Sequence, residues 1–446
     1  MKFSKSVLFA LGTGLMFSAS DFSLFSIESS NGSSAISIFS QVQAAEDNTR
    51  KTKRVPAMRE RVYSQLARAQ KIADGGDTQA GIEVLDAVKD RLSSLNSYEK
   101  AMLFNFYGFL YYGIEDVDNA ITSFEKVVAD KEGVTDALYM STLYSLAQLH
   151  MQKQDYIRAE QALKNWQTEK NGELNASEHV LFAQVFYQQK NYQKALNSID
   201  NAIAISEQSG EALRENWLIL KRAAHYELKQ PQQVTRVMEQ MVRLYNKPQY
   251  WLQLSGMYGE IGEEDKQLAV MEAAWQAGYI SKEEDIMTLA QLYVYHQLPY
   301  KAALLMQSAM DDGRLAVDLK RLQLLSQSYM LAKEDDKAIP VLVQASEISE
   351  TGEFDAQLAQ AYLNLEQWQK AIESAEQALN RGGVENIGDM HLAMGMGHFN
   401  LKRFEQSLLA FAQAEDVPEV RNTAQQWSKY VEKEKGYYVQ LAQVQN

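Results

Sequence analysis

The stretch Phe104–Val127, FNFYGFLYYGIEDVDNAITSFEKV, carries the pattern from which the fold can be predicted. Its first half predicts a helix in which the small Gly108 shares a face with three bulky residues, Phe104, Tyr107 and Tyr111. After a turn, a second helix presents the small Ala120 and the large Phe124 on one face. Small residues allow two helices to approach closely, and large residues fill the space around the contact. The stretch therefore predicts a two-helix hairpin.

The hairpin pattern recurs along the chain in a constant phase. Ten residues occupy the position of Ala120: Gly81, Ala120, Ala159, Ala195, Val234, Gln267, Ala302, Ala338, Ala371 and Ser407. Their successive separations are 39, 39, 36, 39, 33, 35, 36, 33 and 36 residues. The pattern resembles the tetratricopeptide repeat, a helix–turn–helix unit of about 34 residues. We therefore predict an all-α protein: a right-handed superhelical solenoid of about ten hairpins with a C-terminal capping helix.

The two ends of the chain differ from the repeats. Residues 1–44 combine a basic start with an apolar run of about 11 residues, which is typical of a secretory signal peptide. Two cleavage sites fit, one after Ala44 and one after Ser20, and helical patterning soon after Ala45 favours the first. Residues 45–57 are a polar lead-in, 58–417 the predicted solenoid, and 418–446 a capping helix and tail. A secreted chain of this kind in a bacterium would work in the periplasm.

Composition narrows the possible functions. The chain has 446 residues, more than one compact core usually holds, and stacked hairpins resolve this because each buries its apolar face on its neighbours. The net charge of -14 argues against nucleic acid as the main ligand. The absence of cysteine excludes disulfides and thiolate nucleophiles. The lead-in contains a basic cluster of Arg50, Lys51, Lys53 and Arg54. This cluster indicates either a solvated terminus or a contact with anionic lipid or an acidic partner.

No catalytic motif is present in the sequence, so we expect a protein that is not an enzyme and needs no cofactor. His391 and His398 lie two helical turns apart and could suggest a metal site. They occupy slots that Leu143 and Tyr111 fill in other repeats, which favours packing between helices and no metal.

Binding of a polypeptide is the better prediction. In stacked hairpins the first helices line a groove, and the residue after each Gly108-type position should point into it. Five of these residues are glutamines, Gln148, Gln184, Gln291, Gln327 and Gln360. Their amides could pair with a peptide backbone, although glutamine is also a good exposed helix former. Three residues beyond these positions comes a second row rich in apolar and aromatic residues, including Tyr112, Tyr187, Tyr226 and Phe399. The pattern leaves open whether the ligand is extended or helical.

A narrower resemblance covers residues 54 to 430. The segments that carry it are RVPAMRE at 54–60, SYE at 97–99, FNFYGF at 104–109, YELKQP at 226–231, MVRLY at 241–245 and Lys247-Pro248. They resemble secreted repeat proteins of marine and aquatic gamma-proteobacteria that are encoded beside a second TonB system. The resemblance implies a periplasmic adaptor that supports TonB-dependent uptake of iron–siderophore complexes, with TonB, ExbB and ExbD as expected partners. The alternative is a periplasmic scaffold for outer-membrane or cell-wall assembly.

Overall fold

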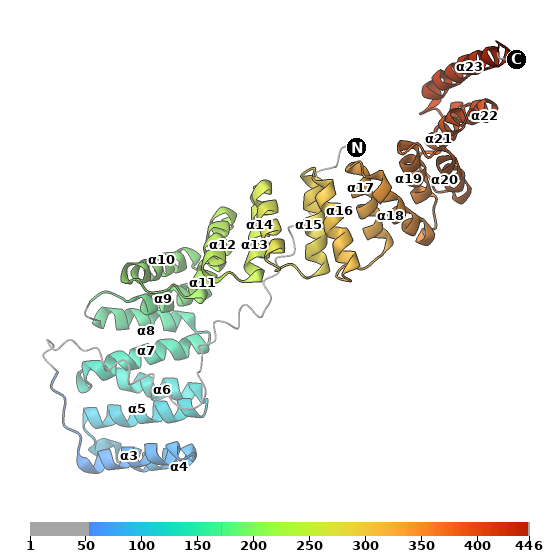
Figure 1. Ribbon diagram of the computed structural model, residues 1–446. Helices are drawn as coiled ribbons and strands as arrows, with labels where there is room; N and C mark the ends of the chain where they lie inside the picture. Colours follow the sequence, from blue (N-terminus) through green and yellow to red (C-terminus); the bar gives the residue numbers. More distant parts are fainter. Residues whose placement is uncertain (1–52, 171, 445–446) are drawn as a thin grey trace. The chain divides into compact units, whose positions relative to one another are not determined.

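The computed structural model describes residues 53–170 and 172–444, and they are helical and without strands (Figure 1). The predicted signal peptide, Arg50 and Lys51 lie outside the described residues. By contacts the chain divides into two compact units, 1–262 and 263–446. The boundary between the units falls between Gly262 and Glu263. We describe each unit by itself.

The described part of unit 1 contains five complete α-helical hairpins and one further α-helix. The hairpins are α3 (Glu60–Asp74) with α4 (Thr78–Lys89), α5 (Ser97–Gly113) with α6 (Val117–Val128), α7 (Asp136–Gln152) with α8 (Tyr156–Glu169), α9 (Ala176–Gln188) with α10 (Tyr192–Ser209), and α11 (Glu215–Glu227) with α12 (Pro231–Tyr245). Helix α13 (Pro248–Glu260) completes the unit.

Unit 2 begins with helix α14 (Glu264–Gln276) and continues with four hairpins. These are α15 (Glu283–Tyr295) with α16 (Pro299–Asp311), α17 (Leu319–Leu331) with α18 (Asp335–Ile348), α19 (Glu353–Asn364) with α20 (Trp368–Arg381), and α21 (Ile387–Asn400) with α22 (Phe404–Glu415). The last helix is α23 (Arg421–Val444). The predicted all-α repeat architecture is confirmed.

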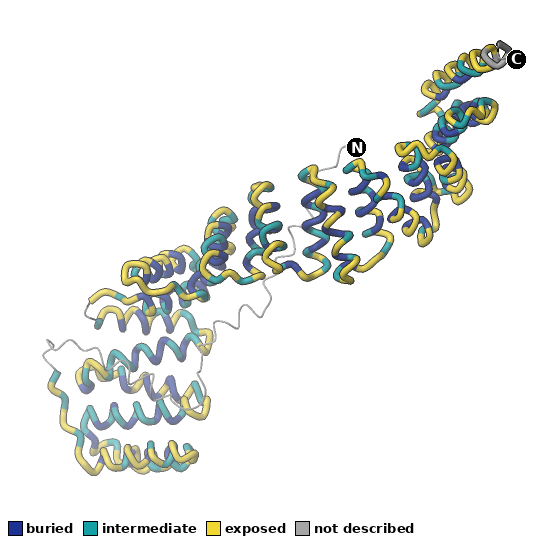
Figure 2. Tube along the Cα trace, in the orientation of Figure 1, coloured by how far each residue is buried: buried dark blue, intermediate teal, exposed yellow. Residues whose placement is uncertain are grey.

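The repeat register is also confirmed. The ten residues at the Ala120 position lie on every other helix from α4 to α22 and are all buried, including the atypical Gly81, Val234 and Gln267. Figure 2 shows buried stretches recurring along the helices of each unit. Each unit therefore buries apolar surface hairpin by hairpin, as expected for a repeat array.

Residue size is matched across each hairpin contact. Gly108 on α5 faces Phe124 on α6, and a Cβ atom added to Gly108 would lie 2.5 Å from the Phe124 ring. Gly395 and Phe411 repeat this geometry in unit 2, also at 2.5 Å. The equivalent slots of the hairpin α7–α8 hold Ala147 and the smaller, buried Leu163. In these hairpins glycine is thus paired with the larger phenylalanine, and alanine with the smaller leucine.

The turn inside each hairpin contains one residue with a positive φ angle. In eight of the turns it is not a glycine: Glu115, Gln154, Lys190, Lys229, Gln297, Lys333, Glu366 and Lys402, with φ between 55° and 63°. Gly76 and Gly262 take this place in the other two turns. In the turns other than the one at Gly262, the following N–H donates to the carbonyl oxygen five residues back, as from Asp155 to His150 at 2.8 Å. This is the hydrogen bond of a Schellman motif, which ends a helix at a left-handed residue.

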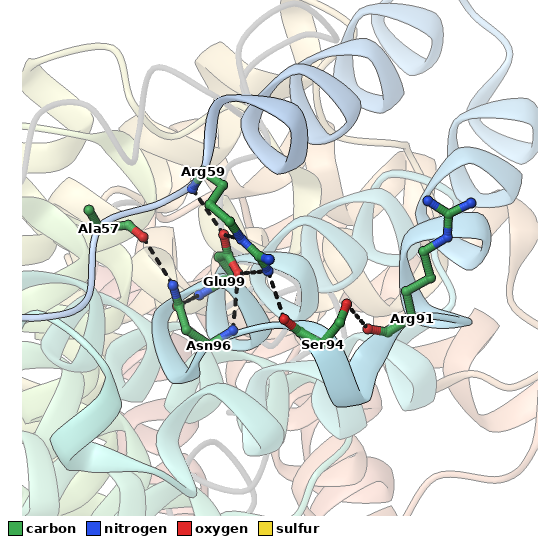
Figure 3. A network of polar contacts seen from close by, with 6 residues as sticks. All are labelled: Ala57, Arg59, Arg91, Ser94, Asn96 and Glu99. Carbon is green, nitrogen blue, oxygen red and sulfur yellow. Dashed lines mark hydrogen bonds and ion pairs between the residues drawn. The ribbon is translucent and has the colours of Figure 1, made fainter.

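The start of α3 is tied to the second hairpin by a buried carboxylate (Figure 3). The backbone N–H, Nε and Nη2 of Arg59 donate to Glu99 at 2.9, 2.8 and 2.5 Å. Glu99 is 0% exposed, and its side chain also closes the capping box of α5 with Asn96. The hydrogen bond from Arg59 is the largest of the effects that lower the pKa of Glu99 from 4.5 to about 2. The buried Glu99 carboxylate is therefore held ionised.

Helix α23 covers the end of unit 2, as predicted for a capping helix. Its Trp427 stacks on Phe411 with the ring centroids 5.7 Å apart, and Val431 is fully buried. Lys435 pairs with Glu405 near the start of α22, so α23 runs antiparallel to α22.

Candidate protein-binding surface

The five predicted glutamines occupy equivalent positions on first helices of both units. Gln148 and Gln184 lie on α7 and α9 of unit 1, and Gln291, Gln327 and Gln360 lie on α15, α17 and α19 of unit 2. Each follows a buried small residue and precedes another buried residue, yet four of the glutamines are half-buried and Gln360 is exposed. The three in unit 2 recur on three successive first helices, and we call them the amide row.

An apolar row accompanies the amide row in unit 2. It consists of Val294, Met330, Leu363 and Phe399, which are all half-buried. Phe399 lies beneath the capping helix, with its ring 5.5 Å from Tyr430 and 6.1 Å from Trp427. The first three members keep part of their surface accessible, so the unit 2 face offers amides and apolar side chains next to each other.

The aromatic residues predicted to line the groove of unit 1 differ in their solvent exposure. Tyr112 and Tyr226 are each 41% exposed and present their rings to solvent. Tyr187 is only 7% exposed, and its ring packs edge-on against Tyr192 at 5.4 Å. Burial raises the pKa of Tyr187 to about 12. The structure therefore places Tyr187 in the hairpin core, where it does not offer the accessible ring that we expected.

The basic cluster of the lead-in is partly engaged within the chain. The Lys53 ammonium group donates to the carbonyl oxygen of Lys131 at 2.7 Å and lies 3.1 Å from a carboxylate oxygen of Glu132. Arg54 is exposed. Of the two described members, Arg54 alone therefore offers an exposed side chain for a membrane or a partner.

The histidine pair lies on α21, between helices. Burial lowers the pKa of both His391 and His398, which favours their neutral forms. Among residues 53–170 and 172–444, no group of three or more His, Asp or Glu side chains is placed to hold a metal ion. The metal interpretation thus finds no further ligand in the part of the chain that the structure describes.

The sequence analysis missed two open hollows on unit 1, of about 630 and 420 Å³. They lie on either side of the turn between α9 and α10, where second helices meet turns. Their lining residues vary from repeat to repeat, and no periodic signal in the sequence marks them.

Comparison with known proteins agrees with the hairpin geometry. Residues 115–202 match a family model described as anaphase-promoting complex, cyclosome, subunit 3. The matched region runs from the turn before α6 into α10, through the most regular hairpins of unit 1. The fold is of the tetratricopeptide-repeat type. Repeats of this type are generally non-catalytic scaffolds that bind proteins.

Several solved structures, two of them described as tetratricopeptide-repeat proteins, also align with parts of the chain. A repeat protein from Parabacteroides merdae is 14% identical over 57% of this chain and 98% of its own, with a TM-score of 0.29. YrrB, described as having an unusual peptide-binding site, is 14% identical over 43% of this chain and 97% of its own, with a TM-score of 0.35. MamA is 21% identical over 40% and 98%, with a TM-score of 0.32. Among curated proteins, none matches the sequence significantly. The fold assignment accordingly rests on the hairpins of this chain.

No helix in the described residues is long and apolar enough to span a bilayer.

Proposed function

We propose that this tetratricopeptide-type protein is a non-catalytic scaffold that binds a partner polypeptide on the unit 2 face. The observation that carries the proposal is the amide row, in which Gln291, Gln327 and Gln360 occupy one slot on three successive first helices. A glutamine amide both donates and accepts hydrogen bonds, so a spaced row can pair with the backbone of a bound segment. The apolar row beside it supplies surface for that segment's side chains.

Replacement of the three glutamines of the amide row by alanine tests this surface. Partner capture from a periplasmic extract should fall in the triple variant, while helicity and unfolding temperature stay nearly unchanged, because alanine is a strong helix former. A matched control replaces three glutamines of the second helices α16, α18 and α20 by alanine: Gln307, Gln344 and Gln377. Equal capture by both triple variants and the wild type would remove the amide row from the binding surface.

We propose further that the scaffold works in the bacterial periplasm as an adaptor for TonB-dependent uptake of iron–siderophore complexes. The signal-peptide pattern and the segments between residues 54 and 430 support this role. An acidic chain would also attract basic partner segments, mainly by raising the rate of association. TonB, ExbB and ExbD are the expected partners.

Deletion of the gene separates this role from the alternative, a scaffold for outer-membrane or cell-wall assembly. A TonB adaptor predicts poor growth under iron limitation that ferrous iron reverses, and recovery of TonB or ExbD with the captured protein. Normal siderophore-dependent growth with a defective envelope would support the assembly scaffold instead.

The non-catalytic assignment has its own test at His391 and His398. Elemental analysis of the purified protein should show no stoichiometric metal. Bound zinc or iron that disappears when both histidines are replaced by alanine would overturn the assignment.

A further inference from the structure

Two histidines flank the central contact of the last hairpin. Gly395 on α21 faces the ring of Phe411 on α22, and Phe411 stacks on Trp427 of the capping helix α23 with the ring centroids 5.7 Å apart. His391 precedes Gly395 by four residues and His398 follows it by three. Residues at these spacings are neighbours on one face of a helix. The two imidazoles therefore lie next to the contact that joins α21, α22 and α23.

Neither imidazole is arranged to hold a positive charge. His391 and His398 are half-buried, and in both rings the Nδ1 atom is buried and has no hydrogen-bond partner among the described residues. In a neutral ring that carries its proton on Nε2, Nδ1 has a lone pair and no hydrogen. Protonation adds an N–H there, and a buried donor without an acceptor costs the desolvation of that group. The folded hairpin therefore favours the neutral form of both rings.

Few charged groups offset this cost. Burial is the cause of the lowered pKa of His391, and it is the largest cause at His398. Arg403, in the turn after α21, lowers the pKa of His398 further, and Glu376 on α20 opposes this effect. Helices α19, α22 and α23 also pack against α21, but none of their described charged side chains shifts the pKa of either histidine. Within the described residues, Glu376 is thus the one carboxylate that favours a charged ring, and it is exposed and screened by solvent.

The other four histidines each have a polar or acidic group near the ring. Nδ1 of His225 lies 2.8 Å from Oε1 of Gln230. Carboxylates lie near the remaining three rings: Asp265 at His296, Asp155 and Glu125 at His150, and Glu178 at His179. Among the described residues, a buried Nδ1 atom without a partner therefore distinguishes His391 and His398 from the other four.

We propose that His391 and His398 form an acid-sensitive switch that loosens α21 from α22 and releases the capping helix α23 when both rings are protonated. A histidine whose pKa is lowered on folding stabilises the fold fully above its unfolded pKa, about 6.5, and that stability is lost as the pH falls through the folded pKa. The Arg59–Glu99 pair in unit 1 weakens only below about pH 5, so the C-terminal end should open first. The switch is separate from the amide row and does not rest on the function proposed for it.

Hydrogen exchange of the full chain at about pH 7.5 and about pH 5.5 tests the switch, with each rate compared with the intrinsic rate at the same pH. Protection factors in α21, α22 and the first turns of α23 should fall at least about threefold at the lower pH, while those in α15–α18 change less. The variant His391→Gln/His398→Gln carries neutral side chains and should lose most of this fall. The control variant His225→Gln/His296→Gln should keep it.

A second variant uses residues that other repeats hold at the same positions. His391→Leu and His398→Tyr copy Leu143 and Tyr111, and this double variant should also resist the change in pH. Nuclear magnetic resonance of the wild type needs no substitution. The ring signals of both histidines should titrate below about pH 6.5, together with the loss of protection.

Three results would overturn the proposal. One is unchanged protection of α21–α23 in the wild type between the two pH values. Another is an equal fall in the wild type and in the variants that lack both histidines. The third is titration of both rings at or above about pH 6.5 in the folded protein. If circular dichroism shows that one double variant does not fold, the other variant and the wild-type titration decide.

Discussion

Gly108 and Gly395 show how single residues set the distance between the helices of a hairpin. Each would place a Cβ atom 2.5 Å from a phenylalanine ring, closer than van der Waals contact permits. The hairpin α7–α8 solves the same problem with Ala147 and Leu163, a larger residue against a smaller one. The two contacting positions therefore form a matched pair, and the size of either side chain limits the size of the other.

Gly108→Ala should destabilise unit 1 even though alanine favours helices. Overpacking costs about 1–3 kcal/mol, against a gain in helix propensity of about 1 kcal/mol. Phe124→Leu in the same chain should recover much of the loss, because it recreates the pair found in α7–α8. Denaturant unfolding of the two single variants and the double variant measures the coupling.

Gly256→Ala is the matched control for that experiment. Gly256 also lies inside a helix of unit 1, but a Cβ atom there would meet nothing within 4 Å. The control should be neutral or stabilising by up to about 1 kcal/mol. Equal effects of Gly108→Ala and Gly256→Ala would contradict the matched-pair explanation.

Glu99 makes the N-terminal hairpins sensitive to acid. Its pKa is about 2 in the folded chain against an ordinary value of 4.5. A lowered folded pKa contributes stability that is fully present above the unfolded value and is lost as the pH falls toward the folded value. The protection factors of the amides in α3 and α5, which compare the measured exchange rate with the intrinsic rate at the same pH, should therefore fall between about pH 5 and pH 2.

Glu99→Gln should remove most of this pH dependence and lower protection already at pH 7, because Arg59 then loses its ionic partner. Glu83→Gln serves as the control, since Glu83 is an exposed carboxylate on α4. Mass spectrometry of exchanged peptides reports on these helices separately from the rest of the chain. An unchanged pH profile in Glu99→Gln would assign the acid sensitivity to other groups.

At the scale of elements, the turns inside the hairpins carry a conformational cost. A non-glycine residue in the left-handed region costs roughly 1–2 kcal/mol, and eight turns hold Lys, Gln or Glu there. The Schellman hydrogen bond that each turn makes offsets part of that cost. The hydrogen bonds of the helix end and the packing of the hairpin thus stabilise the left-handed conformation of the turn. The residue types found there do not favour that conformation.

Lys333→Gly tests this balance in the turn between α17 and α18. Its φ is 63°, a value that glycine adopts without strain, so we expect stabilisation by up to about 1 kcal/mol. Gln323→Gly, an exposed position inside α17, should instead cost about 1 kcal/mol. The unfolding midpoints of the two variants should move in opposite directions, and a shift in the same direction would refute the account.

These turns mark a limit of prediction from sequence. The buried slots at Val234 and Gln267 were predictable only from the repeat spacing, and the other eight were predictable because they hold Gly, Ala or Ser, which a close helix contact favours. The left-handed residues were not, because Lys333 or Glu366 carries no preference for that conformation. The burial of Tyr187 depends on its neighbour Tyr192, and the hollows depend on how side chains of consecutive hairpins meet. Neither follows from spacing along one helix.

At the scale of the whole molecule, the division at Gly262–Glu263 predicts that damage stays local. In a repeat array each hairpin depends on its nearest neighbours, so a loss of structure in one unit need not spread to the other. Ala120 is fully buried in α6, and Ala120→Glu places a charge in a close contact at a cost of several kcal/mol.

Hydrogen exchange should then show lost protection around α5 and α6 in Ala120→Glu, with α15–α22 as protected as in the wild type. Ala338→Glu, at the equivalent slot in α18, should give the reverse pattern. Loss of protection in both units from either substitution would mean that the chain unfolds as one cooperative body.

The tie between Arg59 and Glu99 has a consequence for timing. The two residues are separated by 40 positions, and a ribosome adds about 5–20 residues per second. Arg59 therefore waits about 2–8 s for its partner to be synthesised. The N-terminal end of the array is therefore synthesised first but is stabilised by this ion pair only later. During that interval the first helix remains accessible to chaperones and proteases that act on newly made polypeptides.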